Sequence, residues 1–352
     1  MRHTLLMTGA TGSFGAALLA RLCQDESVGQ VHVISRRAPL AARMAKIRVH
    51  RGDVTAGASI GLDADTAKQV TRQVTTIVHA AADTRFAAPA SDLHRVNVEG
   101  TANVIALAAQ CTRLERVCLL STVYVAGART GNVFETDLPH SSGFVNAYER
   151  SKYDMELLAR ESMSRLPIAV ARLSTVVGSP SPGRHAPVAL HQAVRLMYRS
   201  LAPMVPGGED HPVDLVPIDF ASKAIARLAA GAARPGQTYH VCASIDTIPE
   251  GQLLDLTIEA IARSRPAWRT RAIARPAVVD LETFELFRRS VDAIGDSVLR
   301  DATAVIAAFA PQLAYPKVFD DTGLRQALDG SGIERPCTRS AYTQMVEQLV
   351  EA

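Results

Sequence analysis

The stretch TGATGSFG, residues 8–15, stands between a short apolar run, His3–Met7, and a run with helical periodicity, Phe14–Leu22. In a strand–turn–helix unit, glycines at these spacings allow a tight turn, a close approach of backbone to a pyrophosphate, and close packing of helix on strand. The helix start then presents free N–H groups and a partial positive charge to the phosphates. Residues 8–15, named the glycine turn below, therefore predict a dinucleotide-binding turn. Its glycines are Gly9, Gly12 and Gly15.

Short β-branched runs and amphipathic helical patterns alternate after this turn. This alternation is typical of βαβ units with right-handed crossovers. The expected strands cover Val31–Ser35, Lys46–His50, Thr75–His79, Arg116–Ser121 and Ile168–Leu173, and the clearest helices cover Val96–Gln110 and Ala147–Ser164. The sequence thus predicts an α/β fold, a Rossmann doubly wound parallel sheet.

The alternation of strand and helix patterns stops after Gly178, where SPSPGRHAP (179–187) has the composition of a loop. We expect a dinucleotide-binding core over residues 1–178, a substrate-side loop and helix over 179–212, a return to the sheet over 213–248, and a mainly helical substrate lobe over 249–352. Apolar residues at helical spacing in the second part predict ordinary core, with an acyl channel as the alternative. They are Leu190, Val194, Met197 and Leu201.

The composition of the chain limits which partners and ligands are expected. The chain has 352 residues, is 47% hydrophobic and carries a net charge of +3 without a dense basic block, so nothing points to nucleic acid or an anionic membrane. Its five cysteines form no CxxC pair and lie near no His at metal-ligand spacing, so we expect no metal site. No apolar run reaches the about 18 residues of a membrane span. A soluble, cytoplasmic protein is expected.

The end of the second expected strand decides between NAD and NADP. NAD-binding proteins usually place a carboxylate there for the ribose 2′-OH. This sequence has Ser35, Arg36 and Arg37, and no acid before Asp53. Two guanidiniums suit a 2′-phosphate, so we predict NADP(H), with an exposed basic turn as the alternative.

Tyr148 and Lys152 form a YxxxK pattern at the head of an expected helix. Residues four apart share one helix face, so the ammonium can approach both the phenol and the nicotinamide ribose. A nearby cation favours the phenolate, which predicts a lowered Tyr148 pKa and a role in proton transfer to a carbonyl oxygen.

The fifth expected strand ends in STVYVAG, residues 121–127, which places the hydroxyl of Thr122 at the carboxyl end of the sheet. Open α/β sheets keep their sites at this edge. Thr122 is therefore expected to donate a hydrogen bond to the substrate oxygen. A β-branched strand residue without chemistry is the alternative.

Taken together, these motifs resemble the extended short-chain dehydrogenases/reductases. The residues of these motifs are most similar to those of the fatty acyl-CoA reductase, or male-sterility, branch and of the thioester reductase domains of carboxylic acid reductases. The resemblance implies NADPH binding and reduction of an acyl thioester to an aldehyde, in some cases on to the alcohol. The matching stretches are TGATGSFG, HAAADTRF, NVEGTANV, LLSTVYVAG, FVNAYERSKYDMELLARE and ARLSTVVG, with looser likeness in DLVPIDFASKAI and YHVCA.

The resemblance also assigns roles to individual residues. It makes Thr122, Tyr148 and Lys152 catalytic, and Arg36 or Arg37 the 2′-phosphate ligand. Asn97 belongs either to a proton relay or to a helix kink, and His79 is expected to be structural. The cofactor contacts it implies are Thr8, Gly9, Thr11, Gly12, Ser13, Phe14, Gly15, Asp53, Val54, Ala80, Ala81, Ala82, Asn97 and Lys152. The substrate contacts are Thr122, Val123, Phe144, Asn146 and Tyr148.

Other functions remain open from the sequence. A sugar-nucleotide epimerase or dehydratase shares the Thr/Tyr/Lys set, but such enzymes usually hold NAD. A ketone or aldehyde reductase of secondary metabolism and an NADP-sensing regulator are further alternatives. Because no adenylation or carrier segment is recognised, a CoA ester or a carrier protein is expected to come from a separate molecule. A homodimer is also left open, and residues 249–352 carry no motif that we can assign.

Overall fold

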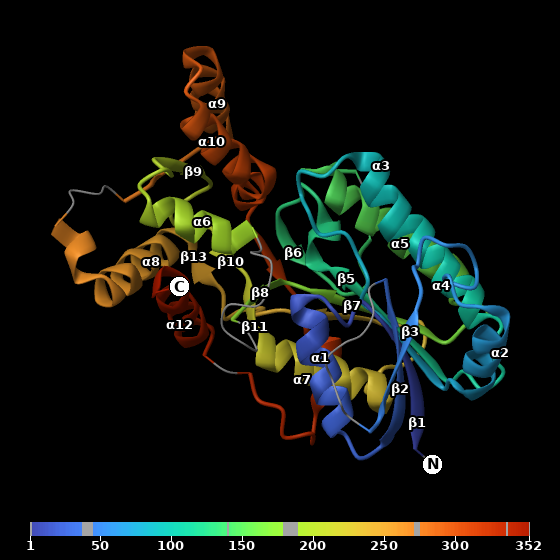
Figure 1. Cartoon of the computed structure of the whole chain (residues 1–352). Helices are drawn as coiled ribbons and strands as arrows, with labels where there is room; N and C mark the ends of the chain where they lie inside the picture. Colours follow the sequence, from blue (N-terminus) through green and yellow to red (C-terminus); the bar gives the residue numbers. More distant parts are fainter. Residues whose placement is uncertain are drawn as a thin grey trace.

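A seven-stranded sheet, parallel throughout, forms the centre of the molecule (Figure 1). The computed structural model describes residues 2–36, 45–138, 141–178, 189–270, 275–335 and 337–351, so the predicted Arg37 lies outside the described residues. The strand order is β12-β7-β5-β4-β1-β2-β3. The strands are β1 (His3–Thr8), β2 (Val28–Ser35), β3 (Ile47–Arg51), β4 (Thr76–His79), β5 (Arg116–Thr122), β7 (Ile168–Leu173) and β12 (Thr238–Val241).

Helices cover both faces of this sheet because alternate strand residues point to opposite sides. Leu5 and Met7 of β1 pack in one apolar cluster with α1 (Ser13–Gln24) and α7 (Ile218–Arg227). Leu6 between them packs in a second cluster with the opposite layer. That layer contains α2 (Ala64–Gln73), α4 (Gly100–Ala108) and α5 (Ala147–Ser162). The predicted doubly wound Rossmann fold is confirmed.

The strand order reverses at the neighbours β1 and β4. From β1 the chain builds outward through β2 and β3, and from β4 it builds the other way through β5, β7 and β12. Open α/β sheets bind their ligands in the crevice at such a switch point, beyond the carboxyl ends of the strands. The glycine turn follows β1 at this point.

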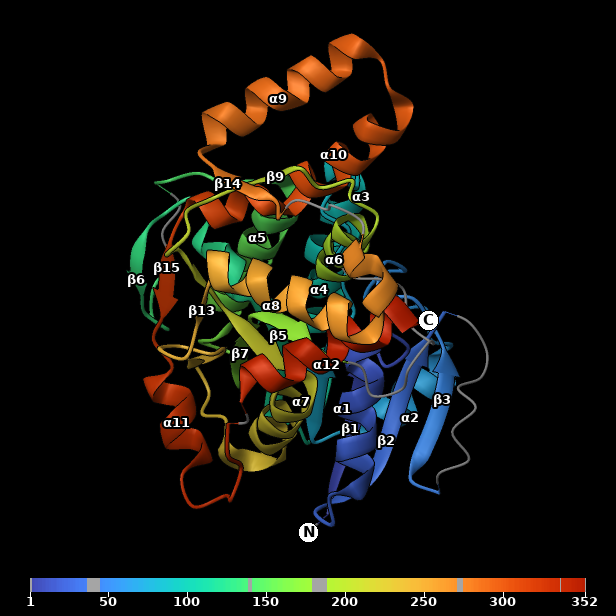
Figure 2. The same cartoon turned by 90° about the vertical axis from the view of Figure 1, so that its left-hand side faces the viewer.

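Residues beyond 178 supply a second, mainly helical body, shown beside the sheet in Figure 1. The helices α6 (Ala189–Tyr198), α8 (Glu250–Ser264) and α12 (Thr338–Glu351) share an apolar cluster. Val194 and Met197 of α6 are buried, as the prediction of ordinary core requires. The hairpin of α9 (Leu281–Ile294) and α10 (Ser297–Phe309) projects from this body (Figure 2).

The C-terminal residues do not all belong to a separate lobe. β15 (Lys317–Phe319) pairs with β6 (Gly131–Val133), and α11 (Thr322–Leu328) packs against β12 at the edge of the sheet. β12 pairs with β7 in the sheet before residue 249, and residues 317–328 also return to the core. The pairing of β6 with β15 has no local signal because the two segments lie far apart in the sequence.

Short elements complete the chain. The remaining strands are β8 (Thr175–Val177), β9 (Met204–Pro206), β10 (Pro212–Val213), β11 (Leu215–Pro217), β13 (Ile248–Pro249) and β14 (Ala277–Val279). The remaining helical segments are α3 (Ala90–Leu93), η1 (His94–Glu99), η2 (Val123–Ala126), η3 (Leu228–Ala232), η4 (Pro266–Thr270) and η5 (Ala310–Ala314). Within the described ranges, none of the helices combines the length and the apolar character needed to cross a membrane.

Candidate active site

The glycine turn is built so that two of its positions accept only glycine. Gly9 has φ +75°, and a Cβ there would lie 2.4 Å from the carbonyl carbon of Ala80. A Cβ on Gly15 would lie 2.0 Å from the Gly9 carbonyl oxygen. At Gly12 the nearest such atom, the Gly9 carbonyl oxygen, is 3.5 Å away, which is an ordinary van der Waals contact. The turn thus packs against β4 and α1 through Gly9 and Gly15, whereas Gly12 is not crowded by its neighbours.

The start of α1 is suited to an anion. Gly12 caps this helix without a side-chain hydrogen bond, and no acidic residue lies in the first turn. The first N–H groups of a helix have no partner within the helix and carry the positive end of its dipole. These features fit the pyrophosphate of a dinucleotide.

His79 is a structural residue, as the sequence predicts. Its Nδ1 lies 2.7 Å from the Thr8 hydroxyl, and its Nε2 lies 3.0 Å from the Thr101 hydroxyl. Burial, with a smaller effect of the Lys152 charge, lowers the pKa of His79 to about 3, so the ring is neutral. The Thr8 hydroxyl also accepts a hydrogen bond from Ala81 N. The Thr8 side chain, predicted to contact cofactor, is therefore buried and joins β1 to the end of β4.

Arg36 is exposed immediately after β2. Its charge helps to lower the pKa of Asp83, although the main cause is the hydrogen bond that Asp83 accepts from Arg85. Arg85 Nη2 lies 2.6 Å from Asp83 Oδ2. Asp83 follows Ala80–Ala82, so the basic end of β2 and the loop after β4 face the same region.

The loop after β3 is closed by its own hydrogen bonds. Asp53 Oδ1 accepts from the backbone N and the hydroxyl of Thr55, both at 2.9 Å. The Val54 carbonyl accepts from Asn103 Nδ2, and the Val54 side chain is buried against α4. The cofactor contact expected of Asp53 stays a prediction, and a contact by Val54 is limited to its backbone or the edge of its side chain.

Thr122 and Tyr148 lie together at the carboxyl end of β5. Thr122 is the last residue of β5, and Tyr148 lies in the first turn of α5, where Asn146 caps the helix. The Thr122 side chain interacts with the phenol and acts to lower its pKa, so the two hydroxyl groups lie close together. Both residues are buried, with 5% and 8% of their surface exposed. The structure therefore joins the two hydroxyls that the sequence assigns to one substrate oxygen.

Burial sets the charge state of this site. It raises the pKa of Tyr148 above the ordinary value for a phenol, and the hydrogen bond with Thr122 offsets only part of this effect. Burial also lowers the pKa of Lys152 to about 8, while the Glu156 carboxylate acts in the opposite direction. The predicted lowering of the Tyr148 pKa is therefore wrong, because burial of the phenol raises this pKa.

Lys152 shares the helix face of Tyr148 but has other partners. Its Nζ donates to the Leu120 carbonyl at 2.8 Å and lies 3.2 Å from Met155 Sδ. The ammonium is thus held against the end of β5, and only 3% of the residue is exposed.

Asn97 lies in η1, a π-helical segment that runs into α4. Its Oδ1 accepts from Asp83 N at 2.8 Å, and its Nδ2 donates to the Asp83 carbonyl and to Ser151 Oγ, both at 2.9 Å. Of the two roles left open by the sequence, these contacts favour a structural one. Asn97 fixes the loop after β4 against α5.

The predicted substrate contacts differ in their surroundings. Val123 is buried in a small apolar cluster with Val133 and Phe319, and its predicted substrate contact stays a prediction. The Phe144 ring packs on Tyr153, with centroids 5.1 Å apart. Asn146 accepts from Glu149 N at 3.0 Å, which explains this residue as a helix cap. Substrate contacts by Phe144 and Asn146 stay predictions.

Two aromatic residues near Tyr148 were not predicted. Phe86 meets the Tyr148 ring edge-on at 5.0 Å, and Phe309 lies 6.5 Å from Phe86. Phe86 is the last residue of the HAAADTRF stretch, so the sequence could have indicated it. Phe309 ends α10 in a region without a motif, so only the fold brings it here.

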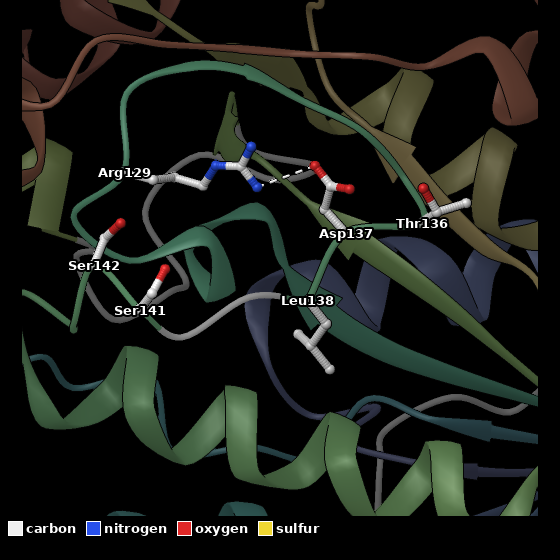
Figure 3. A pocket seen from close by; sticks show the side chains of 6 residues that line it. All are labelled: Arg129, Thr136, Asp137, Leu138, Ser141 and Ser142. Carbon is white, nitrogen blue, oxygen red and sulfur yellow. Dashed lines mark hydrogen bonds and ion pairs between the residues drawn. The ribbon is translucent and has the colours of Figure 1, made fainter.

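A pocket lies on the loop between β6 and α5 (Figure 3). Arg129 and Asp137 form an ion pair across it, with Nη1 and Oδ2 3.0 Å apart. The lining residues are Arg129, Thr136, Asp137, Leu138, Ser141 and Ser142. None of these residues is among the predicted catalytic, cofactor or substrate residues.

Comparisons with known proteins agree with this site. Residues 35–225 match the family model described as male sterility protein. Over 191 residues the chain is 33% identical to the hybrid PKS-NRPS synthetase poxE of Penicillium oxalicum, covering 51% of the chain and 4% of that protein. Over 266 residues it is 27% identical to the glycine betaine reductase ATRR of Emericella nidulans, covering 68% of the chain and 21% of that protein. The chain thus spans only a small part of these relatives.

Solved structures establish the fold over the whole chain. The terminal R domain from the myxalamid PKS-NRPS biosynthetic pathway superposes with a TM-score of 0.80 at 24% identity, covering 99% of this chain and 91% of that one. The reductase domain of a nonribosomal peptide synthetase from Mycobacterium tuberculosis gives 0.69 at 22%, covering 99% and 92%. A UDP-glucuronic acid 4-epimerase from Bacillus cereus gives 0.68 at 15%, covering 99% of both chains.

The family match covers more than half of the chain and includes the segments that carry Thr122, Tyr148 and Lys152. It begins after the glycine turn, so the geometry of that turn is an independent observation. The chain therefore belongs to the male sterility protein family, within the extended short-chain reductases that its motifs resemble.

Proposed function

We propose that this protein is an NADP(H)-dependent reductase that acts on the carbonyl of an acyl thioester and releases an aldehyde or, after a second reduction, an alcohol. The observation that carries the proposal is the close placement of the buried Thr122 and Tyr148 side chains at the carboxyl end of β5. Lys152 lies on the same helix one turn further on, and the glycine turn lies at the same edge of the sheet.

The cofactor would be held by the glycine turn, with its pyrophosphate at the start of α1 and its 2′-phosphate at Arg36. When bound, NADPH supplies the hydride for the carbonyl carbon. The uncrowded position at Gly12 and the absence of an acid in the first turn of α1 support this placement. Arg36 supports NADPH over NADH because a guanidinium attracts a phosphate dianion.

The protein's own groups act on the carbonyl oxygen. Thr122 and Tyr148 would donate hydrogen bonds to this oxygen as it gains negative charge. The raised pKa of Tyr148 keeps its phenol protonated, so it can give a proton in the reductive direction. Lys152 supplies a fixed positive charge nearby. For a thioester, the resulting hemithioacetal releases the thiol and leaves the aldehyde.

The thioester is favoured over a sugar nucleotide by the relatives. They include PKS-NRPS synthetases and the R domains of such enzymes, whose acyl groups we expect to travel as thioesters. The alternative is an epimerase, whose fold is also close. Arg36 favours a reductase over an epimerase, because this residue suits the 2′-phosphate of NADP and epimerases of this fold usually retain NAD.

The experiment that tests the proposal supplies the purified chain with NADPH and a panel of acyl-CoA esters, free aldehydes and UDP-sugars. We expect NADPH oxidation with the acyl thioesters and an aldehyde or alcohol product identified by mass. Conversion of a UDP-sugar without net loss of NADPH would overturn the proposal in favour of an epimerase.

Replacing Arg36 by Ala should reduce the preference for NADPH over NADH. A hydrogen bond to a charged group contributes about 1.5–3 kcal/mol, so the Kd for NADPH should rise about 10-fold to 100-fold while the Kd for NADH changes little. Titration of cofactor fluorescence measures both constants. Arg113→Ala is the control, because Arg113 is exposed just before the amino end of β5. An unchanged ratio in Arg36→Ala would remove Arg36 from the cofactor site.

A further inference from the structure

A buried carboxylate follows the proposed catalytic tyrosine directly. Glu149 has no exposed surface. Its Oε2 accepts a hydrogen bond from Val145 N at 2.9 Å, and its Oε1 accepts from Asn146 Nδ2 at 3.4 Å and from the Gln312 side-chain amide. Two of these donors lie at the start of α5, but Gln312 belongs to η5, far along the sequence.

Gln312 connects this carboxylate to a buried ammonium. Lys317 donates to Gln312 Oε1 and to the Tyr315 carbonyl, both at 2.9 Å. Only 5% of Lys317 is exposed. The amide of Gln312 therefore presents its N–H group to a negative charge and its oxygen to a positive charge. We name this chain of contacts the Glu149–Gln312–Lys317 bridge.

The bridge is an electrostatically matched unit. Burial raises the pKa of Glu149 to about 7 and lowers the pKa of Lys317 to about 8, and in each case the opposite charge of the other residue counteracts burial. Removal of one partner of a buried ion pair leaves an uncompensated charge in a dry environment. Loss of Lys317 alone should therefore disturb the start of α5, whereas loss of both charges should disturb it less.

The segment that contains Gln312 and Lys317 makes two further contacts near Tyr148. Asn146 Nδ2 lies 3.3 Å from the Ala308 carbonyl oxygen. Phe309 lies beside Phe86, which meets the Tyr148 ring edge-on. Residues 308–317 thus contact the start of α5 on both sides of Tyr148 in the sequence, at Asn146 and at Glu149.

We propose that the Glu149–Gln312–Lys317 bridge positions Tyr148 for catalysis by holding residues 308–317 against the first turn of α5. Glu149, Gln312 and Lys317 are positioning residues, because none of them contacts Thr122 or the expected cofactor site in the structure. The inference rests on the proposed function of Tyr148 and extends it to residues 308–317, which carry no motif.

The test compares four purified full-length proteins with the wild type. Lys317→Met removes the ammonium and keeps much of the side-chain volume. Gln312→Leu removes the connecting amide. Glu149→Gln with Lys317→Met removes both charges but keeps an amide partner for Gln312. Glu135→Gln is the matched control, since Glu135 is also buried and accepts bonds from Gly323 N and Leu324 N, away from Tyr148.

Two readouts separate positioning from stability. The Kd for NADPH and kcat with the acyl thioester are measured on the folded fraction of each protein. A displacement of about 1 Å at a reacting group can cost about 100-fold in rate, so Lys317→Met and Gln312→Leu should lower kcat by about that factor. Their Kd for NADPH should stay within about twofold of the wild type. The double variant should recover much of the lost kcat, and Glu135→Gln should keep it.

Hydrogen exchange provides the second readout and needs no turnover. Lys317→Met should speed amide exchange in residues 145–150 and 308–317 together, whereas Glu135→Gln should speed it only near residues 322–325 and near His240, where backbone N–H groups donate to Glu135. Unchanged kcat in the folded single variants, or exchange that rises in one segment alone, would overturn the bridge. If Lys317→Met does not fold, the double variant decides the question. A kcat of the double variant as low as that of Gln312→Leu would contradict the claim that the two charges of the bridge compensate each other. A wild type that reduces no substrate would instead overturn the proposed function and leave the exchange result standing.

Discussion

Replacing Tyr148 by Phe should lower kcat by about 100-fold to 10,000-fold, the range expected for loss of a general acid. The phenol is buried, lies close to the Thr122 side chain and is kept protonated by its raised pKa. Phe retains the ring and therefore the edge-on contact with Phe86, so the fold should survive. The Kd for NADPH should stay unchanged because the role proposed for the phenol is at the substrate oxygen and not at the cofactor. Steady-state rates and cofactor titration measure both quantities.

A matched control separates catalysis from the loss of any buried hydroxyl. Tyr342 is also buried, and its hydroxyl lies 2.6 Å from that of Thr257 between α12 and α8. Tyr342→Phe should therefore cost some stability and leave kcat unchanged. Retention of turnover in Tyr148→Phe at near the wild-type rate would contradict the role of this phenol.

The second large effect is expected in the glycine turn. Ala at position 9 needs the left-handed backbone conformation and places its Cβ within 2.5 Å of backbone atoms of Ala80 and Ala81. Left-handed strain costs about 1–2 kcal/mol and overpacking about 1–3 kcal/mol, so Gly9→Ala should lose about 2–5 kcal/mol of unfolding free energy. NADPH binding should disappear with the turn. Thermal unfolding with and without NADPH measures both effects.

Gly12 provides the comparison within the same turn. A Cβ there has no neighbour closer than 3.5 Å, so Gly12→Ala should keep the thermal stability of the wild type without cofactor. If the pyrophosphate approaches this backbone, the Kd for NADPH should still rise by at least about 10-fold, since a methyl group would stand between them. Tight NADPH binding by Gly12→Ala would place the cofactor elsewhere.

The central sheet was predictable because its strands are buried on both faces. Such strands appear as continuous apolar runs, as in VHVIS and IAVARL, and the turns between them carry local signals. The pairing of β6 with β15 and the return of α11 to the sheet had no such signal. These contacts join segments nearly 200 residues apart, and only the packed fold brings them together.

The site was predictable where one motif fixes several residues at once. YxxxK and STVYVAG gave Tyr148, Lys152 and Thr122, and the structure joins the two hydroxyls. The predicted direction of the Tyr148 pKa shift was wrong because motifs do not report burial, which raises this pKa. The burial of Val123 was likewise not reported by its motif, since the short helix η2 places this side chain in an apolar cluster. Gln312 and Lys317 were missed because nothing near them in the sequence indicates a partner beside Tyr148.

The most direct test of the account follows deuterium from the cofactor into the product. NADPH labelled at either face of nicotinamide carbon 4 is incubated with the chain and an acyl-CoA thioester, and the product is analysed by mass and NMR. With one of the two labelled cofactors, we expect one deuterium on the former carbonyl carbon of the aldehyde, with one free thiol and one NADP⁺ formed per aldehyde. Product without label from either cofactor would contradict hydride transfer from NADPH to the thioester. Conversion of a UDP-sugar with no net oxidation of NADPH would contradict it as well.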